Sequence, residues 1–285
     1  MTTLSALYRS ARSRLTDAGV DSAALDARLL VQQATGSSLD DIVCRPTQPV
    51  SPEAEAWLDE ALQRRLAGEP VHRILGRREF FGLELKLSPE TLEPRPDTEV
   101  LVELALAEGR RIVGTRGACR ILDLGTGTGA IGLALANGLP EANVTLTDVS
   151  ADALATARRN AETLGLAGRV ATLASDWFDH VEGVFDLIVS NPPYIPSAEI
   201  GSLAREVRDF DPLRALDGGT DGLDAYRAIA DGAARHLASD GAVAVEIGAG
   251  QKDDVLRLFG ARNFRHDATG KDLSGHDRAL LFAAR

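Results

Sequence analysis

The sequence predicts an α/β protein in which a small all-α helical bundle and a β-hairpin precede a domain built on a parallel sheet. Three observations support this prediction. Apolar residues recur at helical spacing in residues 1–75, and they alternate with a period of two in residues 79–87. From about Asp97 onward, strand-like and helix-like segments alternate, which is typical of a parallel sheet with helices on both faces.

Turn and capping residues divide residues 1–75 into helices. Ser51 and Pro52 mark the clearest helix start, with Ser as the N-cap and Pro at the first helical position. Gly68 can end that helix. Earlier helices are expected over residues 4–15, between a cap at 21 or 22 and Gly36, and briefly over 39–43 before a proline.

Residues 79–87 have the period of a strand. Leu83, Leu85 and Leu87 alternate with polar residues, which indicates a half-buried strand. Phe80-Phe81-Gly82 precede it, so a small β-hairpin is expected. We expect residues 76–93 to link the helical domain, 1–75, to a second domain, 94–285.

The second domain is expected to hold its ligands beyond the carboxyl ends of its strands, as open α/β sheets do. The expected helices cover residues 98–110, 130–137, 151–164, 222–237 and 252–259, and the expected strands cover 120–124, 144–147, 170–173, 185–190, 242–247, a stretch near 264, and 278–282.

Composition argues against several classes of protein. The net charge of -11 disfavours a duplex nucleic-acid binder, which needs Lys and Arg to neutralise phosphates. Cys44 and Cys119 are far apart and are expected to be two buried, reduced thiols rather than a disulfide. The scattered histidines predict no metal site. No apolar run suggests a signal peptide or a membrane span, so a cytoplasmic protein is expected, and nothing indicates more than a monomer.

A glycine-rich segment, Asp123 to Gly129, follows the first strand of this domain and opens a helix. Such a turn lets the backbone approach a ligand, but alone it also fits a structural turn or a dinucleotide site. Its GxGxG spacing lacks the third glycine of the dinucleotide fingerprint. Asp148 ends the next strand 23 residues after Gly125 (148 minus 125), close to the spacing of about 20 for a ribose-binding carboxylate. We therefore expect a nucleoside cofactor, with Asp148 accepting from both ribose hydroxyls.

Two further segments complete the expected cofactor pocket. Asp123 can hold the ammonium of a methionine-type cofactor, directly or through water. Ser175, Asp176 and Trp177 follow the third strand, where Asp176 can accept from the exocyclic amine of adenine and Trp177 can lie against the ring. For Trp177 the alternative is a buried side chain at a strand end.

Asn191-Pro192-Pro193-Tyr194 ends the fourth strand and is the most specific pattern in the chain. The amide nitrogen of glutamine, like the exocyclic amine of adenine, is a poor nucleophile because its lone pair is delocalised. The Asn191 side-chain oxygen and the Pro192 carbonyl can accept its two N–H groups, which aligns the nitrogen with a methyl donor and stabilises its growing positive charge. Tyr194 would pack on the planar amide, and no general base is assigned.

Over nearly its whole length the chain resembles the bacterial release-factor glutamine methyltransferases of the HemK/PrmC type. Asn-Pro-Pro-Tyr alone is shared with amino methyltransferases of adenine, but together with Pro94-Arg95-Pro96-Asp97-Thr98-Glu99 it is far more specific. The similarity also takes in Ile74-Leu75-Gly76, Glu79-Phe80, Asp176-Trp177-Phe178, Ile195, Ala215-Leu216-Asp217-Gly218-Gly219, Asp221-Gly222-Leu223, Glu246-Ile247-Gly248, Gln251, Asp272-Leu273-Ser274-Gly275 and Arg278.

The resemblance implies a helical bundle, a hairpin and a Rossmann-like, seven-stranded domain that uses S-adenosylmethionine. It implies methyl transfer to N5 of the glutamine in the Gly-Gly-Gln loop of class I release factors. Glu93 departs from the family, which usually has an apolar residue there, and is expected to add only a surface charge near the site. The implied cofactor contacts are Gly125, Thr126, Gly127, Thr128, Gly129, Asp148, Trp177 and Asn191, and the implied substrate contacts are Asn191, Pro192, Pro193 and Tyr194.

Three alternatives stay open. A related enzyme could modify a glutamine of a ribosomal protein, chosen by the N-terminal domain and by the loop from Pro196 to Thr220. A DNA adenine methyltransferase would need a basic groove, which the net charge and the near-neutral helical segment disfavour. A non-catalytic cofactor-binding protein could share the fold, although an intact Asn-Pro-Pro-Tyr segment argues against it.

Overall fold

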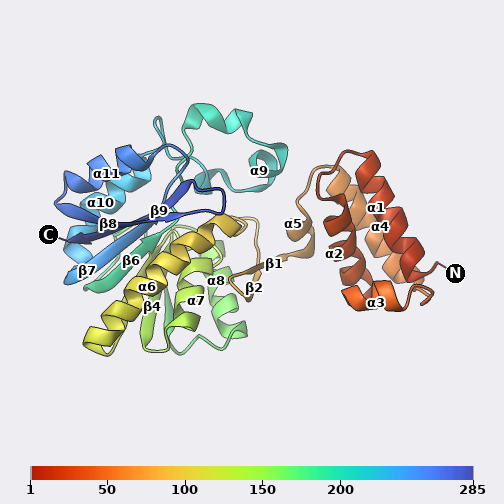
Figure 1. Ribbon diagram of the computed structural model, residues 1–285, viewed down its shortest axis with the longest axis horizontal. Helices are drawn as coiled ribbons and strands as arrows, with labels where there is room; N and C mark the ends of the chain where they lie inside the picture. Colours follow the sequence, from red (N-terminus) through yellow and green to blue (C-terminus); the bar gives the residue numbers. More distant parts are fainter. Residues whose placement is uncertain (1, 285) are drawn as a thin grey trace. The chain divides into compact units, whose positions relative to one another are not determined.

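The computed structural model describes residues 2–284, which form two units divided between Arg77 and Arg78 (Figure 1). The order of elements follows the sequence-based prediction: helices, a hairpin, and then alternating strands and helices. Within the described residues, no helix is both long enough and apolar enough to span a bilayer. Cys119 is buried and Cys44 is exposed, so the expectation of two buried thiols is wrong for Cys44, which lies at the end of a short surface helix.

The first unit is helical throughout. Its apolar stripes pack into one core, and a buried ion pair joins Arg65 to Asp26 at 2.6 Å inside it. One short helix was not predicted: the chain turns back into a helix directly after Pro70, and Gly76 ends it in the left-handed conformation. The helices are α1 (Leu4–Asp17), α2 (Ala23–Thr35), α3 (Leu39–Cys44), α4 (Pro52–Leu66) and α5 (Val71–Leu75).

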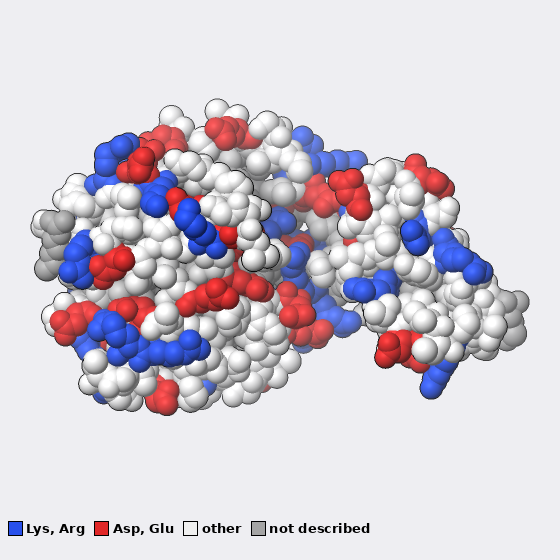
Figure 2. Space-filling model, viewed as in Figure 1, with Lys and Arg blue, Asp and Glu red and all other residues white. Residues whose placement is uncertain are grey.

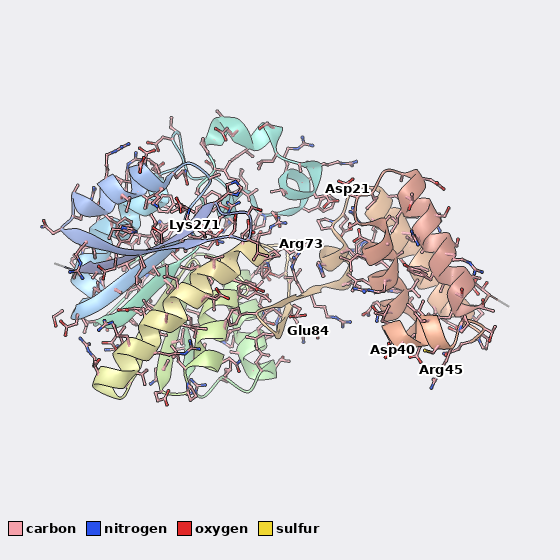
Figure 3. All side chains as sticks on the ribbon, viewed as in Figure 1. Asp21, Asp40, Arg45, Arg73, Glu84 and Lys271 are labelled. Atoms are coloured by element: carbon pink, nitrogen blue, oxygen red, sulfur yellow. The ribbon has the colours of Figure 1, made fainter. Side chains whose placement is uncertain are left out.

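The predicted hairpin is present, with strands β1 (Arg77–Phe80) and β2 (Leu83–Lys86). Phe81 and Gly82 form its turn with φ angles of 51° and 74°, the left-handed conformation that short hairpin turns require. Strand β2 alternates buried and exposed residues, and Figure 3 labels the exposed Glu84. The alternation of apolar and polar residues therefore correctly indicated a strand with one buried face.

Glu93 is not the surface charge that the sequence suggested. Its side chain is only 5% exposed and forms an ion pair with Arg78, at the other end of the hairpin segment. A buried carboxylate of this kind needs a partner, and Arg78 supplies it. The expectation was wrong because the partner lies 15 residues away in sequence, which no local pattern reveals.

The second unit contains a sheet that has seven strands within the described residues, in the order β5-β4-β3-β6-β7-β9-β8. Its strands are β3 (Cys119–Leu124), β4 (Ala142–Asp148), β5 (Val170–Ala174), β6 (Phe185–Ser190), β7 (Leu237–Glu246), β8 (Phe264–Lys271) and β9 (Asp277–Ala284).

The prediction of a parallel sheet is correct from β3 to β7 and wrong for the last two strands. Strand β9 runs antiparallel to both β7 and β8. Only residues 272–276 connect β8 to β9, and a connection this short can join only antiparallel neighbours.

Helices cover both faces of the sheet, as predicted. Figure 1 shows α6, α7 and α8 over one face and α10 and α11 over the other, and each face has its own apolar core. The helices of this unit are α6 (Glu99–Arg116), α7 (Ala130–Gly138), α8 (Ala151–Thr163), α9 (Arg205–Phe210), α10 (Asp224–His236) and α11 (Lys252–Gly260), with short 3-10 turns at Pro96–Thr98, Ser197–Ser202 and Leu213–Ala215.

Asn160, a residue without a sequence signal, ties the hairpin to the glycine-rich loop. It lies on α8 and is 1% exposed. Its amide pairs with both the N–H and the carbonyl of Lys86, at 2.9 and 3.1 Å, much as a neighbouring strand would. The same amide nitrogen donates to the Thr128 carbonyl at 2.9 Å. One buried side chain therefore holds the end of the hairpin against the glycine-rich loop.

We expect Asn160→Ala to lower the free energy of unfolding by about 1–3 kcal/mol, because it leaves buried backbone groups of Lys86 and Thr128 unpaired. Chemical denaturation of the full chain measures this. Thr163→Ala is the matched control, since that hydroxyl bonds the same helix at its exposed end and its loss should cost less than about 0.5 kcal/mol. Equal effects of the two substitutions would contradict the role given to Asn160.

Candidate active site

A cavity of about 270 Å³ opens where β3, β4, β5 and β6 end. All of its lining residues belong to the second unit. Parallel strands end at the same edge of a sheet, so loops far apart in sequence meet there. The predicted site residues that line the cavity are Gly125, Thr126, Gly127, Thr128, Asp148, Asp176, Trp177, Asn191 and Pro193.

The glycine-rich loop and Asp148 form one rigid piece. Gly125 and Gly127 have φ angles of 66° and 54°, which an L side chain rarely adopts, so both positions favour glycine. The Gly127 N–H donates to Asp148 Oδ2 at 2.9 Å, and the Ser150 N–H donates to Asp148 Oδ1 at 2.9 Å. The carboxylate is thus held in place by backbone donors at the rim of the cavity, and each oxygen can still accept from a ligand.

Gly129 and Asp123 lie behind this loop rather than on the cavity wall. Gly129 caps α7 with φ 85°, and a Cβ there would meet Leu133 at 2.9 Å. Asp123 is 1% exposed and braces the loop, since its Oδ2 accepts from the Thr126 hydroxyl at 2.6 Å and from the Gly132 N–H at 3.0 Å. Its Oδ1 has no hydrogen-bond partner within the described residues.

Burial raises the pKa of Asp123 to about 7, although Thr126 and Gly132 favour the charged form. The nearby carboxylate of Asp148 adds to the rise. A buried carboxyl with one unpaired oxygen is expensive to maintain, and such groups concentrate at functional sites.

The turn after β5 is strained. Trp177 has a φ of 44°, uncommon for a residue other than glycine, and costs of order 1 kcal/mol or more. The Ser175 hydroxyl holds the turn, donating to the Trp177 carbonyl and accepting from the His180 N–H, both at 3.0 Å. Trp177 is partly buried against the core under α10 and α11, and it also lines the cavity, so it is only in part the buried strand-end residue considered as the alternative.

The Asn-Pro-Pro-Tyr segment divides between cavity and core. Asn191 and Pro193 line the cavity, whereas Pro192 is buried and Tyr194 packs against the apolar core. Asn191 Nδ2 donates to the Thr98 hydroxyl at 3.2 Å, which leaves the Asn191 side-chain oxygen for a ligand. Burial raises the pKa of the Tyr194 phenol well above its usual range, so Tyr194 stays neutral.

Three contacts fix the backbone beyond Tyr194. The Gln251 side chain donates to the Tyr194 carbonyl at 2.9 Å, and Ile195 exchanges backbone hydrogen bonds with Leu216 and Gly218. A Cβ on Gly222 would lie 2.4 Å from the Tyr194 carbonyl oxygen, so only glycine fits. These contacts explain why the segment from Leu216 to Gly222, which is distant in sequence, is part of this site.

Two ion pairs stand at the rim of the cavity. Arg95 donates to the buried carboxylate of Asp211 at 2.6 Å, and Arg214 lies 3.3 Å from Glu90. Both pairs connect the segment after the proline-rich loop, which carries α9, to residues 90–95. One side of the rim is therefore charged, whereas Pro94 and Pro193 line the wall of the cavity.

Sequence reasoning missed several residues of the cavity. Some lie next to predicted segments, and others come from Pro94-Arg95-Pro96-Asp97-Thr98-Glu99, which the resemblance singled out without assigning a role. That hexapeptide was the sequence feature that could have identified these additional cavity residues. The missed lining residues are Glu90, Leu92, Pro94, Arg95, Thr98, Ala130, Ile131, Val149, Arg214 and Ala215, whereas Ser175 also lines the cavity as part of the expected Ser175–Trp177 segment.

Comparison with known families matches both units. Residues 6–76 match the PrmC N-terminal domain, and residues 106–206 match the methyltransferase small domain. A solved methyltransferase structure from Pyrococcus furiosus is similar to the chain with a TM-score of 0.54 at 22% identity, covering 78% of this chain and 96% of that one. This similarity shows the methyltransferase fold.

Full-length relatives are more informative. The chain is 51% identical over 280 residues to the release factor glutamine methyltransferase of Agrobacterium fabrum, covering 98% of this chain and 97% of that protein. It is 49% identical over 273 residues to the enzyme of the same description from Bradyrhizobium diazoefficiens, covering 95% and 92%. With this identity over almost its whole length, the chain belongs to the family of release factor glutamine methyltransferases.

Proposed function

We propose that this protein transfers a methyl group from S-adenosylmethionine to N5 of the glutamine in the Gly-Gly-Gln loop of class I release factors. The observation that carries the proposal is the position of Asn191. Its side chain lines the cavity that also contains Asp148 and the glycine-rich loop, and its amide N–H is already bonded to Thr98. A hydrogen-bond acceptor for a substrate amide thus lies in the same cavity as the nucleoside-binding residues.

The cavity residues fit the cofactor. The glycine backbone leaves room beside Asp148, whose oxygens can accept from ribose hydroxyls. Asp176 and Trp177 line the cavity, which supports their assignment to the adenine. Asp123 lies behind the glycine-rich loop, and its unpaired Oδ1 supports the proposed contact with an ammonium through water. When bound, S-adenosylmethionine supplies an electrophilic methyl group on a positively charged sulfur.

The protein contributes orientation and electrostatic stabilisation. Asn191 and the Pro192 carbonyl accept the two N–H groups of the substrate amide, so its nitrogen is held in one direction. As positive charge grows on that nitrogen, these acceptors stabilise it, and the buried site strengthens the effect. No base is needed before transfer, because the methylated nitrogen is acidic enough to lose its proton afterwards.

Substrate choice is assigned to the helical domain, residues 1–75, and to the loop from Pro196 to Thr220. The loop borders the cavity through Arg214 and Ala215, so it can contact a protein that delivers its glutamine there. We also propose that the active form is a monomer. Because release factors act in translation, we place the reaction in the cytoplasm.

The competing functions fit less well. On the face shown in Figure 2, basic and acidic side chains are interspersed over the second unit rather than gathered into a basic groove, and the net charge is -11. A DNA adenine methyltransferase would need the opposite. A ribosomal-protein glutamine would use the same chemistry, so only the substrate test separates it. A non-catalytic role gives no reason for Asn191 to keep its side-chain oxygen available to a ligand in the cavity.

We expect a purified class I release factor, incubated with this protein and S-adenosylmethionine, to gain one methyl group on the glutamine of its Gly-Gly-Gln loop. Intact-mass and peptide mass spectrometry measure the gain. Asn191→Ala should lower the rate by about 10²–10³-fold, the usual cost of losing one preorganised polar group. Cofactor binding should remain measurable by calorimetry.

The matched control is Asn143→Ala, at an exposed position near the start of β4, which should keep full activity. Equal loss of rate and of cofactor affinity in Asn191→Ala would remove the catalytic role of Asn191. If ribosomal proteins or adenine in DNA are methylated and release factors are not, the proposed substrate is wrong, whereas the proposed methyl-transfer chemistry stands.

Asp148→Ala should weaken cofactor binding about 10- to 100-fold, because hydrogen bonds to a charged acceptor contribute about 1.5–3 kcal/mol. Calorimetric titration with S-adenosylmethionine measures the Kd. Asp152→Ala, an exposed carboxylate in the first turn of α8, is the control and should bind normally. An unchanged Kd in Asp148→Ala would contradict the ribose assignment.

Cofactor affinity should rise as the pH rises through about 7. The pKa of Asp123 is raised to about 7 in the folded protein, so the carboxylate is mostly protonated below that pH and charged above it. Only the charged form attracts an ammonium. Calorimetric Kd values between pH 6 and 8.5 should follow this titration, and Asp123→Asn should abolish it. A pH dependence that persists in Asp123→Asn would assign it to another group.

A further inference from the structure

The side chain of Gln251 joins three loops around the Asn-Pro-Pro-Tyr segment. Its Nε2 donates to the Tyr194 carbonyl at 2.9 Å and to the Gly222 carbonyl at 3.2 Å. Its Oε1 accepts from the Gly248 N–H at 3.0 Å. These loops follow β6, precede α10 and follow β7, so one partly buried amide connects segments that lie up to 57 residues away in sequence.

The three partners leave only one orientation for the Gln251 amide. Two carbonyl oxygens require a donor, and a backbone N–H requires an acceptor. Rotating the amide by half a turn would place its oxygen against both carbonyls and its NH₂ group against the Gly248 N–H. The Tyr226 hydroxyl lies 3.4 Å from Oε1, but its single hydrogen has a shorter bond, 3.0 Å, to the Glu246 carbonyl. The backbone partners alone therefore determine the orientation.

Two glycines let the backbone come this close to the amide. A Cβ on Gly222 would lie 2.4 Å from the Tyr194 carbonyl oxygen and 2.8 Å from Gln251 Nε2. A Cβ on Gly248 would lie 2.7 Å from Gln251 Oε1 and 3.0 Å from Tyr194 Cδ2. Distances this short leave no room for a side chain unless the loops move. Two of the segments shared with the family are thus parts of one arrangement around Gln251.

The middle of the Asn-Pro-Pro-Tyr segment has no backbone donor with which to hold itself in place. Pro192 and Pro193 lack an N–H group, so their backbone can only accept hydrogen bonds. Before the segment, the Ser190 hydroxyl bonds the last carbonyl of β3 at 2.8 Å. At the other end, Gln251 supplies a donor to the Tyr194 carbonyl. Helix α11 does not use this side chain, which forms no capping bond within residues 2–284.

From these contacts we infer that Gln251 is a positioning residue for methyl transfer, because it fixes the loop that presents Asn191 and the Pro192 carbonyl to the substrate amide. The inference rests on the proposed function. Gln251 is not among the described residues that line the cavity, and it acts through the backbone of Tyr194. A displacement of about 1 Å between reacting groups can cost about 100-fold in rate. Asp148 and the glycine-rich loop hold each other, so cofactor binding should depend far less on Gln251.

The first test compares Gln251→Met with Gln251→Glu. Methionine has a similar length but no donor, and a carboxylate would place negative charge against two carbonyl oxygens. We expect kcat for methylation of a release factor to fall by about 10- to 100-fold in both variants, while the Kd of S-adenosylmethionine changes far less. Rate measurements and calorimetric titrations of the full chain measure this. A normal kcat in Gln251→Met, or equal losses of kcat and of cofactor affinity, would overturn the inference.

Two controls separate positioning from a general loss of stability. Tyr226→Phe removes a buried hydroxyl 3.4 Å from the same amide but leaves the three backbone contacts of Gln251 in place. It should lower the Tm, because the Glu246 carbonyl loses its donor, and keep most of kcat. Asn143→Asp makes the same change from amide to carboxylate at an exposed site and should keep full activity. A Tyr226→Phe enzyme as slow as Gln251→Met would overturn the inference.

Hydrogen exchange followed by NMR tests the arrangement without a substrate. The Gly248 N–H donates to Gln251, and the Ile195 N–H, directly after Tyr194, donates to the Leu216 carbonyl at 3.0 Å. Both N–H groups should exchange about 10-fold faster or more in Gln251→Met, while those within β4 exchange as in the wild type. Unchanged exchange at both groups would overturn the inference. If release factors are never methylated, the proposed function fails, and this measurement still decides whether Gln251 holds the loop.

Discussion

The register of β3 against its two neighbours determines where the functional loops lie. Leu124, the last residue of β3, pairs with Thr147 on one side and Ser190 on the other. The residues that follow these positions are Gly125, Asp148 and Asn191, so the glycine-rich loop and the two side chains proposed to bind the ribose and the substrate amide emerge at one level. A shift of one residue would turn every side chain to the opposite face of the sheet.

Side-chain bonds lock this register at the edge of the sheet. The Ser190 hydroxyl donates to the Leu124 carbonyl at 2.8 Å, and the Thr147 hydroxyl donates to the Asp123 carbonyl at 3.1 Å. Both hydroxyls are buried and bond carbonyls at the end of β3, where the strands separate and the ladder no longer supplies partners. These buried hydrogen bonds therefore hold neighbouring strands together at the same edge of the sheet where the cavity opens.

Two buried carboxyls lie behind the cavity on different sides. Asp123 braces the glycine-rich loop, and Glu246 accepts a hydrogen bond from Tyr194 of the Asn-Pro-Pro-Tyr segment. Burial raises the pKa of each to about 7 and leaves each with an oxygen that lacks a partner within the described residues. Stability alone would favour apolar residues in such places.

The sequence by itself determined the parts of this protein that depend on local chemistry. Capping residues and the spacing of apolar residues located the helices and strands, and the glycine spacing with Asp148, together with Asn-Pro-Pro-Tyr, marked segments that line one cavity. Tertiary structure decided what depends on partners distant in sequence: the pairing of Glu93 with Arg78, the role of Asn160, the antiparallel β9, and the hydrogen bond between Thr98 and Asn191. Local patterns record the conformation of each segment, whereas a hydrogen bond across 93 residues exists only after the sheet has brought its ends together.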